Sequence, residues 1–183
     1  IKQFLIENSQ IHNTIDELLI FFIRSFPRAY SIILYSNNNI YAFKDRYGVR
    51  PLGYKINSIQ QNLLLSSEFE SDSCEIEAGE LVKFNNLQKT SIYKYGNITK
   101  ASCLFEYIYF MNENTTWYDH KVKNVREDFG RLLAKSDFDN FNNKDFIVVG
   151  IPQSGIPSGK AYAEYLNLQY KQLIEKNTKV QRT

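Results

Sequence analysis

Four residues near the end of the chain have the types and the order of an anion-binding loop. Pro152, Gln153, Ser154 and Gly155 stand between a short apolar strand expected over 145–151 and a helix expected over 158–166. Where a strand leads through a loop into a helix, backbone N–H groups and the helix N-terminus converge on an anion. The alternative is an ordinary strand–helix turn without a ligand. The pattern therefore predicts an anion site at 152–155, positioned by an α/β unit that begins near residue 145.

A second polar cluster lies in the first half of the chain, where residues 44–52 read Lys-Asp-Arg-Tyr-Gly-Val-Arg-Pro-Leu. Gly48 can take a positive φ in a tight turn, because it has no Cβ. The plainest role for Asp45 and Arg50 is a surface ion pair across this turn, worth about 0 to 1 kcal/mol. Further along, the pair Ser67 and Glu70 fits a capping box that opens a short helix.

The segment 103–110 reads Cys-Leu-Phe-Glu-Tyr-Ile-Tyr-Phe, a run of apolar and aromatic side chains interrupted by one carboxylate. This combination is too particular for a generic hydrophobic core. Val122, Arg126 and Gly130 follow it, on an amphipathic helix expected over 122–134. We interpret the segment as a seam between two domains.

Composition excludes several classes of protein. The 183 residues carry a net charge of +2, with Lys and Arg interspersed among Asp and Glu, so we expect no nucleic-acid partner. The apolar run 18–23 is far shorter than the roughly 20 residues that cross a bilayer, and no signal peptide is visible, so we expect no membrane partner. Cys74 and Cys103 form no C-x-x-C motif or disulfide framework, which favours a reducing cytosol and a cytoplasmic protein.

The periodicity of the first half predicts one helix and a set of antiparallel strands. Apolar residues spaced by three and four predict a helix over 15–26, capped by Asn13 or Thr14. The Asn cluster at 37–39 predicts a hairpin between 29–35 and 40–43. Further strands are expected over 49–54, 62–66, 81–84 and 92–95, with the linker zone around 85–86 and 96–97. We therefore expect domains over 1–98 and 99–183.

Together these segments resemble the glutamine phosphoribosylpyrophosphate (PRPP) amidotransferases. Residues 44–52 and 66–68 match the family patterns Arg-Asp-x-x-Gly-x-Arg-Pro-Leu and Ala-Ser-Glu, with departures at Lys44 and Ser66. Residues 103–110 match Cys-x-Phe-Glu-Tyr-x-Tyr-Phe, and 152–155 match Pro-Asp-Ser-Gly except at Gln153. The last eight residues resemble Lys-Asn-Arg-Tyr-x-x-Arg-Thr, with matches at Lys176, Asn177, Arg182 and Thr183. Residues 111–115 and Lys123 depart from the family, and Lys123 stands near the ammonia path that the family implies.

The resemblance implies a fold and a set of sites. The fold is the C-terminal half of an α+β N-terminal-nucleophile (Ntn) glutaminase, an αββα sandwich, over 1–98. The start of an α/β type I phosphoribosyltransferase domain follows over 99–183. The implied glutaminase scaffold residues are Asp45, Gly48, Arg50, Ser67 and Glu68. Pro152, Gln153, Ser154 and Gly155 would receive the pyrophosphate of PRPP, and the phosphate or nucleotide contacts would be Lys176, Asn177, Arg182 and Thr183.

The resemblance also implies an activity, amidophosphoribosyltransferase, which transfers ammonia from glutamine to PRPP in the first step of de novo purine synthesis. Its expected partners are glutamine, PRPP, purine nucleotide inhibitors and further copies of the chain in a homo-oligomer, with Mg²⁺ as cofactor. Since the chain begins with Ile1 and not Met, we expect an internal segment of a longer protein. The nucleophilic cysteine would then precede Ile1 and the ribose-binding Asp-Asp motif would follow Thr183. We therefore place no catalytic or metal-ligating residue in the chain, and expect neither glutaminase nor transferase activity from it alone.

Three alternatives stay open at this point. Cys103 is either a buried structural cysteine, which we favour, or a ligand of a 4Fe–4S cluster. The chain could come from another glutamine amidotransferase of the same class, such as an asparagine synthetase, although no ATP-pyrophosphatase signature follows its first domain. It could also be a non-catalytic remnant kept for nucleotide sensing.

Overall fold

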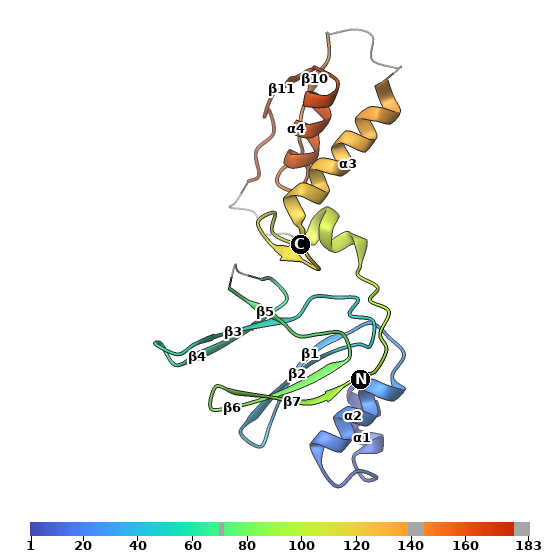
Figure 1. The fold of residues 1–183 in the computed structure, drawn as a ribbon, viewed down its shortest axis with the longest axis vertical. Helices are drawn as coiled ribbons and strands as arrows, with labels where there is room; N and C mark the ends of the chain where they lie inside the picture. The colour runs from blue at the N-terminus through green and yellow to red at the C-terminus, as the bar shows by residue number, and fades with distance from the viewer. Residues whose placement is uncertain (70–71, 139–144, 178–183) are drawn as a thin grey trace. The chain divides into compact units, whose positions relative to one another are not determined.

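The computed structural model of the protein describes residues 1–69, 72–138 and 145–177. The chain divides into two compact units, Ile1–Cys103 and Leu104–Thr183 (Figure 1). The boundary expected at residue 98 lies in the stretch 95–103, which has neither helix nor strand. That the two units are the two enzyme domains stays a prediction.

Unit 1 begins with two helices, α1 (Lys2–Asn8) and α2 (Ile15–Ser25). Helix α2 was expected over 15–26, and Thr14 caps it, because its side chain accepts a hydrogen bond from the N–H of Glu17 at 3.2 Å. The other candidate cap, Asn13, instead donates its backbone N–H to the Glu17 carboxylate at 3.0 Å. The apolar stripe of α2 turns inward, with Leu19 and Phe22 fully buried.

The strands of unit 1 form two antiparallel sheets. One contains β1 (Ser31–Ser36), β2 (Asn39–Lys44), β6 (Glu80–Asn85) and β7 (Gln88–Lys94) in the order β1-β2-β6-β7. The other contains β3 (Gly53–Asn57), β4 (Asn62–Ser66) and β5 (Cys74–Glu75) in the order β4-β3-β5. The predicted hairpin joins β1 to β2, and its turn residues Asn37 and Asn38 have φ values of 49° and 58°. Asn tolerates this left-handed backbone, as the hairpin prediction assumed.

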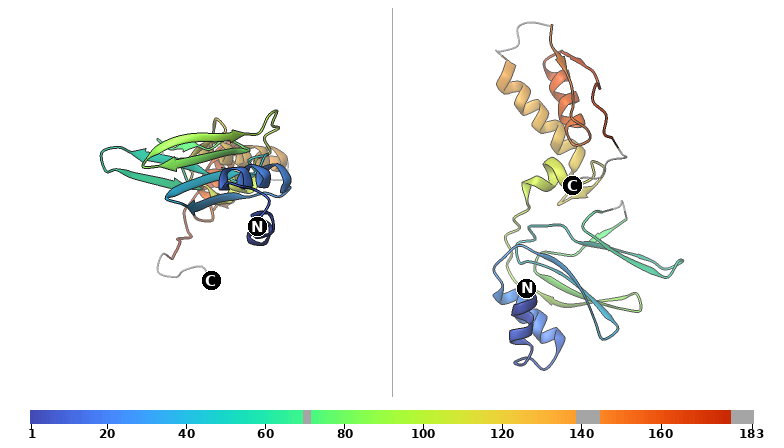
Figure 2. Two further views of the ribbon diagram at one scale, coloured as in Figure 1. Left: turned by 90° about the horizontal axis from the view of Figure 1, so that it is seen from below. Right: turned by 180° about the vertical axis from the view of Figure 1, so that it is seen from behind.

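Unit 1 has three layers: helix, sheet and sheet (Figure 2). Alternate residues of β2 and β6 point to opposite faces of the four-stranded sheet. Phe43 and Leu81 pack with α2 in one core cluster, whereas Ala42 and Val82 pack toward the second sheet in the other. The α+β character expected for this half is therefore observed.

In its described residues, unit 2 contains a π-helix, two α-helices and two small strand pairs. The helices are η1 (Glu106–Phe110), α3 (Val122–Asp137) and α4 (Gly155–Tyr165). The strands are β8 (Thr116–Trp117), β9 (His120–Lys121), β10 (Ile147–Val148) and β11 (Gln169–Tyr170). Strands β10 and β11 pair in parallel, with α4 between them in sequence. The strand–loop–helix order predicted near residue 145 is thus present, and α4 packs on α3 (Figure 1).

Two expectations about strands were wrong. The strand expected over 49–54 begins only at Gly53, because residues 45–49 form a turn held by Asp45 and Pro51 has no N–H to give to a ladder. The strand expected over 145–151 is shorter and comprises only Ile147–Val148, and Ile147 is 47% exposed.

One expectation about connections was also wrong, and a second falls partly outside the described residues. Residues 85–86 do not belong to a linker, since Asn86 and Leu87, with φ of 44° and 67°, turn the chain tightly from β6 into β7. The capping box relied on Glu70, which lies outside the described residues, and the described neighbours 67–69 and 72–73 are not helical.

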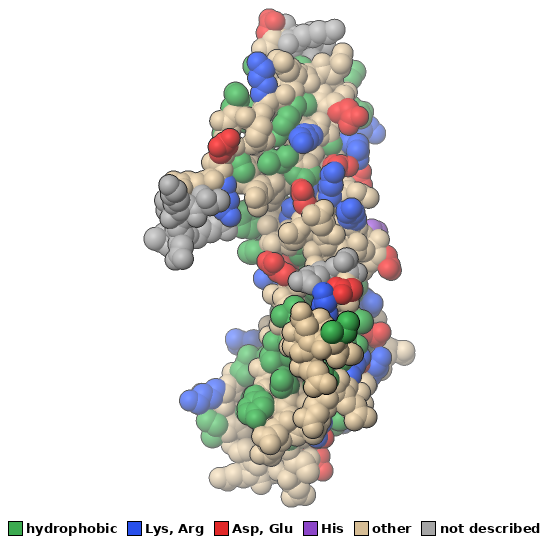
Figure 3. Space-filling view, turned by 90° about the vertical axis from the view of Figure 1, so that its left-hand side faces the viewer, with side chains coloured by type: hydrophobic (Ala, Val, Ile, Leu, Met, Phe, Trp, Pro, Cys, Tyr) green, Lys and Arg blue, Asp and Glu red, His purple; other side chains and the backbone are tan. Residues whose placement is uncertain are grey.

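The surface carries charges of both signs. In the view of Figure 3, Lys and Arg side chains are interspersed with Asp and Glu, and no face of a single sign stands out. Among the described residues, no helix is long and apolar enough to cross a membrane.

Candidate functional site

Asp45 organises the turn that contains the first predicted site residues. It is 2% exposed, and its carboxylate accepts backbone N–H groups from Tyr30 at 3.3 Å, Tyr47 at 2.9 Å and Val49 at 3.3 Å. A buried carboxylate needs such donors, because an unpaired charge costs several kcal/mol in the interior. The idea of a surface ion pair with Arg50 was therefore wrong for Asp45, whose role is to fix the backbone.

Two glycines complete this turn. Gly48 has a φ of 64° and donates its N–H to the Asp45 carbonyl at 3.0 Å, so the predicted positive φ is confirmed. Gly79, with a φ of 65°, donates to the same carbonyl at 2.9 Å, and a Cβ there would lie 2.6 Å from Tyr95 Cβ. The Asp45 carbonyl thus accepts one N–H from within the turn, that of Gly48, and one from a distant part of the sequence, that of Gly79.

The other predicted scaffold residues lie elsewhere in unit 1. Ser67 and Glu68 are exposed in a bend after β4, where the N–H of Glu68 donates to Ser66 Oγ at 2.9 Å. Within the ranges 1–69 and 72–138, neither residue has a hydrogen bond or an ion pair to Asp45. Arg50 is half-buried, and its carbonyl accepts Ser31 Oγ at 3.3 Å. The predicted scaffold residues do not converge on one point, and their roles stay predictions.

Lys44, where the family has Arg, is fully buried and paired with Glu75 at 2.6 Å. Burial lowers the pKa of Lys44, while the Glu75 carboxylate acts in the opposite direction. The pair joins β2 to β5, so it ties the two sheets of unit 1 together. Lys44 therefore has a structural role in the motif.

The predicted anion loop lies between β10 and α4. Pro152, Gln153 and Ser154 form a turn, and Gly155 opens the helix with its N–H bonded to the Ile151 carbonyl at 3.0 Å. The Pro152–Gln153 peptide bond is cis. Gln153 is exposed and the other three are half-buried. The strand–loop–helix order is the one that suits an anion at a helix N-terminus, but the ligand stays a prediction.

Arg126 is a buried cation that the sequence reasoning named without a role. It is 4% exposed, and burial lowers its pKa. Its Nε donates to the Tyr107 carbonyl at 2.7 Å and its Nη2 to the Met111 carbonyl at 2.8 Å. The side chain therefore fastens the carboxyl end of η1 to α3. Its spacing from Val122 and Gly130, four residues each way on one helix face, is the signal that could have shown its burial.

The residues expected near the end of the chain are only partly described. Lys176 and Asn177 are exposed, in a stretch without helix or strand. Arg182 and Thr183 lie outside the described residues. The phosphate contacts expected for these four residues stay predictions.

The two cysteines are free thiols, with Cys74 exposed and Cys103 half-buried instead of fully buried. The N–H of Cys103 donates to the Val49 carbonyl at 3.0 Å. In the ranges that the structure covers, no group of three or more His, Cys, Asp or Glu side chains comes together to hold a metal ion.

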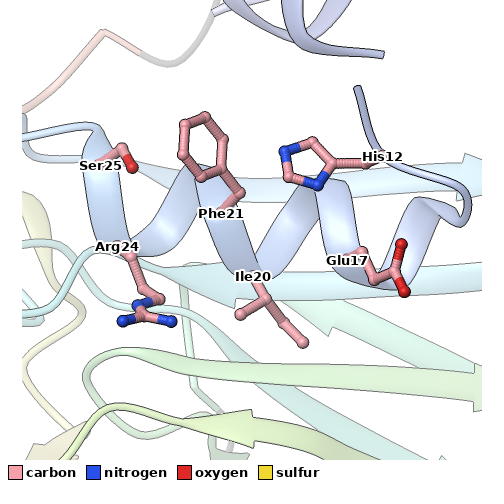
Figure 4. A pocket seen from close by; sticks show the side chains of 6 residues that line it. All are labelled: His12, Glu17, Ile20, Phe21, Arg24 and Ser25. Atoms are coloured by element: carbon pink, nitrogen blue, oxygen red, sulfur yellow. The ribbon is translucent and has the colours of Figure 1, made fainter. Parts of the chain in front are cut away.

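A shallow pocket of about 550 Å³ on α2 was not foreseen from the sequence. It is lined by His12, Glu17, Ile20, Phe21, Arg24 and Ser25. Figure 4 shows His12 and Phe21 on one side of the helix and Ile20 and Arg24 on the other, and the His12 and Phe21 rings lie 4.9 Å apart. His12 is thus half-buried against an aromatic ring. Glu17 is occupied in the helix cap, through both its carboxylate and its backbone N–H.

Comparison with known proteins finds relatives that share one name, amidophosphoribosyltransferase. No family model matches the chain. It is 28% identical to the amidophosphoribosyltransferase of Mycobacterium leprae over 98% of this chain and 32% of that enzyme. The human amidophosphoribosyltransferase is 32% identical over 86% of this chain and 34% of its own length. The Archaeoglobus fulgidus enzyme is 28% identical over 100% of this chain and 39% of its own.

Solved structures agree with these relatives. The structure of glutamine PRPP amidotransferase from B. subtilis, complexed with ADP and GMP, matches with a TM-score of 0.70 and 23% identity. It covers 99% of this chain and 44% of that one. At such identity the match establishes the fold alone. The chain spans about a third of the length of the curated relatives it matches. Over nearly its whole length, it is therefore a homologue of a segment of the amidophosphoribosyltransferases, and it has the fold of the corresponding part of glutamine PRPP amidotransferase.

Proposed function

We propose that this chain is part of an amidophosphoribosyltransferase, which transfers ammonia from glutamine to PRPP and yields 5-phosphoribosylamine, pyrophosphate and glutamate. In this role it serves the first step of de novo purine synthesis. The observation that carries the proposal is the match to the M. leprae enzyme over 98% of the chain. Since the relatives reported above are all amidophosphoribosyltransferases, they favour this enzyme over an asparagine synthetase.

Each unit has its own task in this proposal. Unit 1 is part of an Ntn glutaminase domain, and Asp45 and Gly48 stabilise its backbone at the turn without touching glutamine. Unit 2 begins a type I phosphoribosyltransferase domain and carries the pyrophosphate loop. The layers of unit 1 and the strand–loop–helix order of unit 2 support this assignment.

The chemistry of the loop 152–155 is binding and orientation. The N–H groups of Gly155 and Ile156 already donate to the Ile151 and Gln153 carbonyls, and Pro157 has no N–H, so the donors proposed for the departing pyrophosphate are the N–H groups of Gln153 and Ser154. The positive dipole end of α4 adds to them. Among the described residues the Ser154 side chain makes no capping hydrogen bond, and its hydroxyl is proposed as a further donor. Such preorganised donors lower the barrier by stabilising the charge that develops on the leaving group.

The described residues do not fit a metal site. Besides forming no group of three metal-ligating side chains, they supply no carboxylate at the loop, since Gln153 stands where the family has Asp. We assign no magnesium ligand in this chain and derive no step through the metal. For Cys103 we propose a structural role, because no cluster of thiols surrounds it in the described ranges.

The proposed partners follow from the relatives. They are glutamine, PRPP and purine nucleotides, and further copies of the chain in a homo-oligomer. The B. subtilis enzyme was solved with ADP and GMP, which supports nucleotide binding here. Two free cysteines suit a reducing cytosol, which we propose as the location.

A matched pair of variants tests the loop. A Cβ at Gly155 would lie 3.7 Å from Ile151 Cβ, an ordinary contact, so the position tolerates a side chain. Gly155→Asp places a negative charge at the helix N-terminus, where it favours the helix but repels an anion. We expect calorimetry to show pyrophosphate affinity reduced at least about tenfold in Gly155→Asp, and within about threefold of the unaltered chain in Gly155→Ala.

Two results would contradict the proposed anion site. If the unaltered chain binds neither pyrophosphate nor PRPP, the proposed site is wrong. Equal affinity in Gly155→Asp and Gly155→Ala would move the site away from this helix end.

A further inference from the structure

Three elements of unit 2 meet at Arg126. Its guanidinium, buried on α3, donates to the carbonyls of Tyr107 and Met111 at the carboxyl end of η1. Water cannot replace these bonds in the interior, and a buried cation left without acceptors is strongly destabilising. Any displacement of Arg126 must therefore carry the end of η1 with it.

The backbone of the same residue holds α4. Ser158 Oγ donates to the Arg126 carbonyl at 2.8 Å. One turn further along α3, Gly130 allows the backbones to touch, because a Cβ there would lie 2.2 Å from the Ser158 carbonyl oxygen. Ser158 is only three residues beyond Gly155, in the first turns of α4. Packed interiors transmit such a displacement, since they contain little empty space to absorb it.

A tryptophan, Trp117, lies beside Tyr107 at the η1 end of these contacts, and its fluorescence can be measured. Tyr107 OH donates to the Trp117 carbonyl at 2.7 Å, and the two rings lie 5.4 Å apart. Trp117 is 1% exposed and is the single tryptophan of the chain. Its fluorescence therefore reports on one place in the chain, where the Trp117 ring lies against Tyr107 of η1 and stacks on Tyr118.

The geometry points to Arg126 as a positioning residue that, through Ser158, couples the loop 152–155 to η1. An anion of the pyrophosphate class bound at the loop pulls on the amino end of α4. The Ser158–Arg126–Tyr107 contacts carry this shift to Trp117. The inference rests on the proposed function, because it requires the anion at the loop, and it adds a link between that loop and the aromatic segment.

Ser158→Ala tests the link with little harm to the fold, since Ala is the best helix former and the substitution removes only a hydroxyl. Tyr162→Phe is the matched control. It also removes one hydrogen bond between α4 and α3, from Tyr162 OH to Asp137 Oδ2 at 2.9 Å, but it leaves Arg126 untouched. Inorganic pyrophosphate is the probe, and each chain is titrated both by calorimetry and by Trp117 emission.

In the unaltered chain and in Tyr162→Phe, we expect the emission to change with the same midpoint as the heat. In Ser158→Ala, loss of one hydrogen bond should weaken binding by about threefold to tenfold. The emission change at saturation should fall to less than about half.

Five results would overturn the inference. A full emission change in Ser158→Ala excludes the link, and an equal loss in Tyr162→Phe makes it a general effect of helix packing. Heat of binding without any emission change in the unaltered chain refutes the link but leaves the proposed function standing. No heat at all in the unaltered chain refutes both. Complete loss of binding in Ser158→Ala would place Ser158 in the anion site itself, which also contradicts a positioning role.

Discussion

Two buried polar groups of unit 1 show how differently a side chain can be satisfied. The Asp45 carboxylate accepts three backbone N–H groups, so its charge stabilises the turn that the family motif encodes. Tyr30 lies 5% exposed in the adjacent aromatic cluster, and among the described residues its hydroxyl has no hydrogen-bond partner. Asp45 is therefore bonded to the backbone and not to Arg50 in a surface ion pair. The Tyr30 hydroxyl, in contrast, lowers the stability of unit 1 because it is buried without a partner in the described part of the chain.

Tyr30→Phe should therefore stabilise unit 1 by about 1 kcal/mol or leave it unchanged, because it removes an unpaired buried hydroxyl. Burial, together with the nearby Asp45 carboxylate, raises the pKa of Tyr30. A raised folded-state pKa means that stability is complete below the unfolded pKa of about 10 and is lost as the pH rises further. Tyr30→Phe should lose less stability than the unaltered chain between about pH 10 and 12.

Urea denaturation at pH 7 and at pH 11 measures both effects. Tyr35→Phe is the control, since its hydroxyl is on an exposed side chain and, within the part of the chain that the structure describes, bonds to Asn38 alone. It should change stability by less than about 0.5 kcal/mol. A loss of more than about 1 kcal/mol in Tyr30→Phe would show that its hydroxyl is paired in solution.

At the scale of elements, the crossing of α3 and α4 decides where the anion loop lies. The two helices touch backbone to backbone at Gly130 and Ser158. Ala is normally about 1 kcal/mol better than Gly inside a helix. Here the added methyl group would overlap the Ser158 carbonyl, and overpacking costs about 1 to 3 kcal/mol or more.

We therefore expect Gly130→Ala to lower the free energy of unfolding of unit 2 by about 1 to 2 kcal/mol, and thermal denaturation followed by Trp117 fluorescence measures it. Gly155→Ala, a glycine in the partner helix with ordinary space around its Cβ, should be neutral or slightly stabilising. A stabilised Gly130→Ala variant would mean that the helices lie further apart than described.

What the sequence predicted well is local. Helix α2 with its Thr14 cap, the Asn37–Asn38 hairpin and strand β4 follow from spacing and turn chemistry within a few residues. The failures have two kinds of cause. The start of β3 is set by the turn in which the Val49 N–H donates to the Asp45 carboxylate, and by Pro51, which has no N–H for a ladder. The Ser158–Arg126 bond joins residues 32 positions apart, and no local pattern encodes such a bond, so the sequence pointed to Arg126 but not to its role.

For the chain as a whole, the similarity to amidophosphoribosyltransferases extends over nearly the full length, whereas the proposed anion loop lies in unit 2. The net charge is only +2, and the charges are mixed on the surface seen in Figure 3, so long-range attraction for an anion is weak. Affinity must then come from short-range donors at the loop and at the amino end of α4. We therefore propose that residues 152–155 hold a pyrophosphate group.

Two-dimensional ¹H–¹⁵N NMR of the labelled chain, titrated with inorganic pyrophosphate, follows each backbone amide of this loop separately. We expect saturable shifts of the backbone amides of Gln153, Ser154, Gly155 and Ile156, with little change in the turn around Asp45. Saturable shifts confined to other residues, or no saturable shift at all, would contradict this proposal.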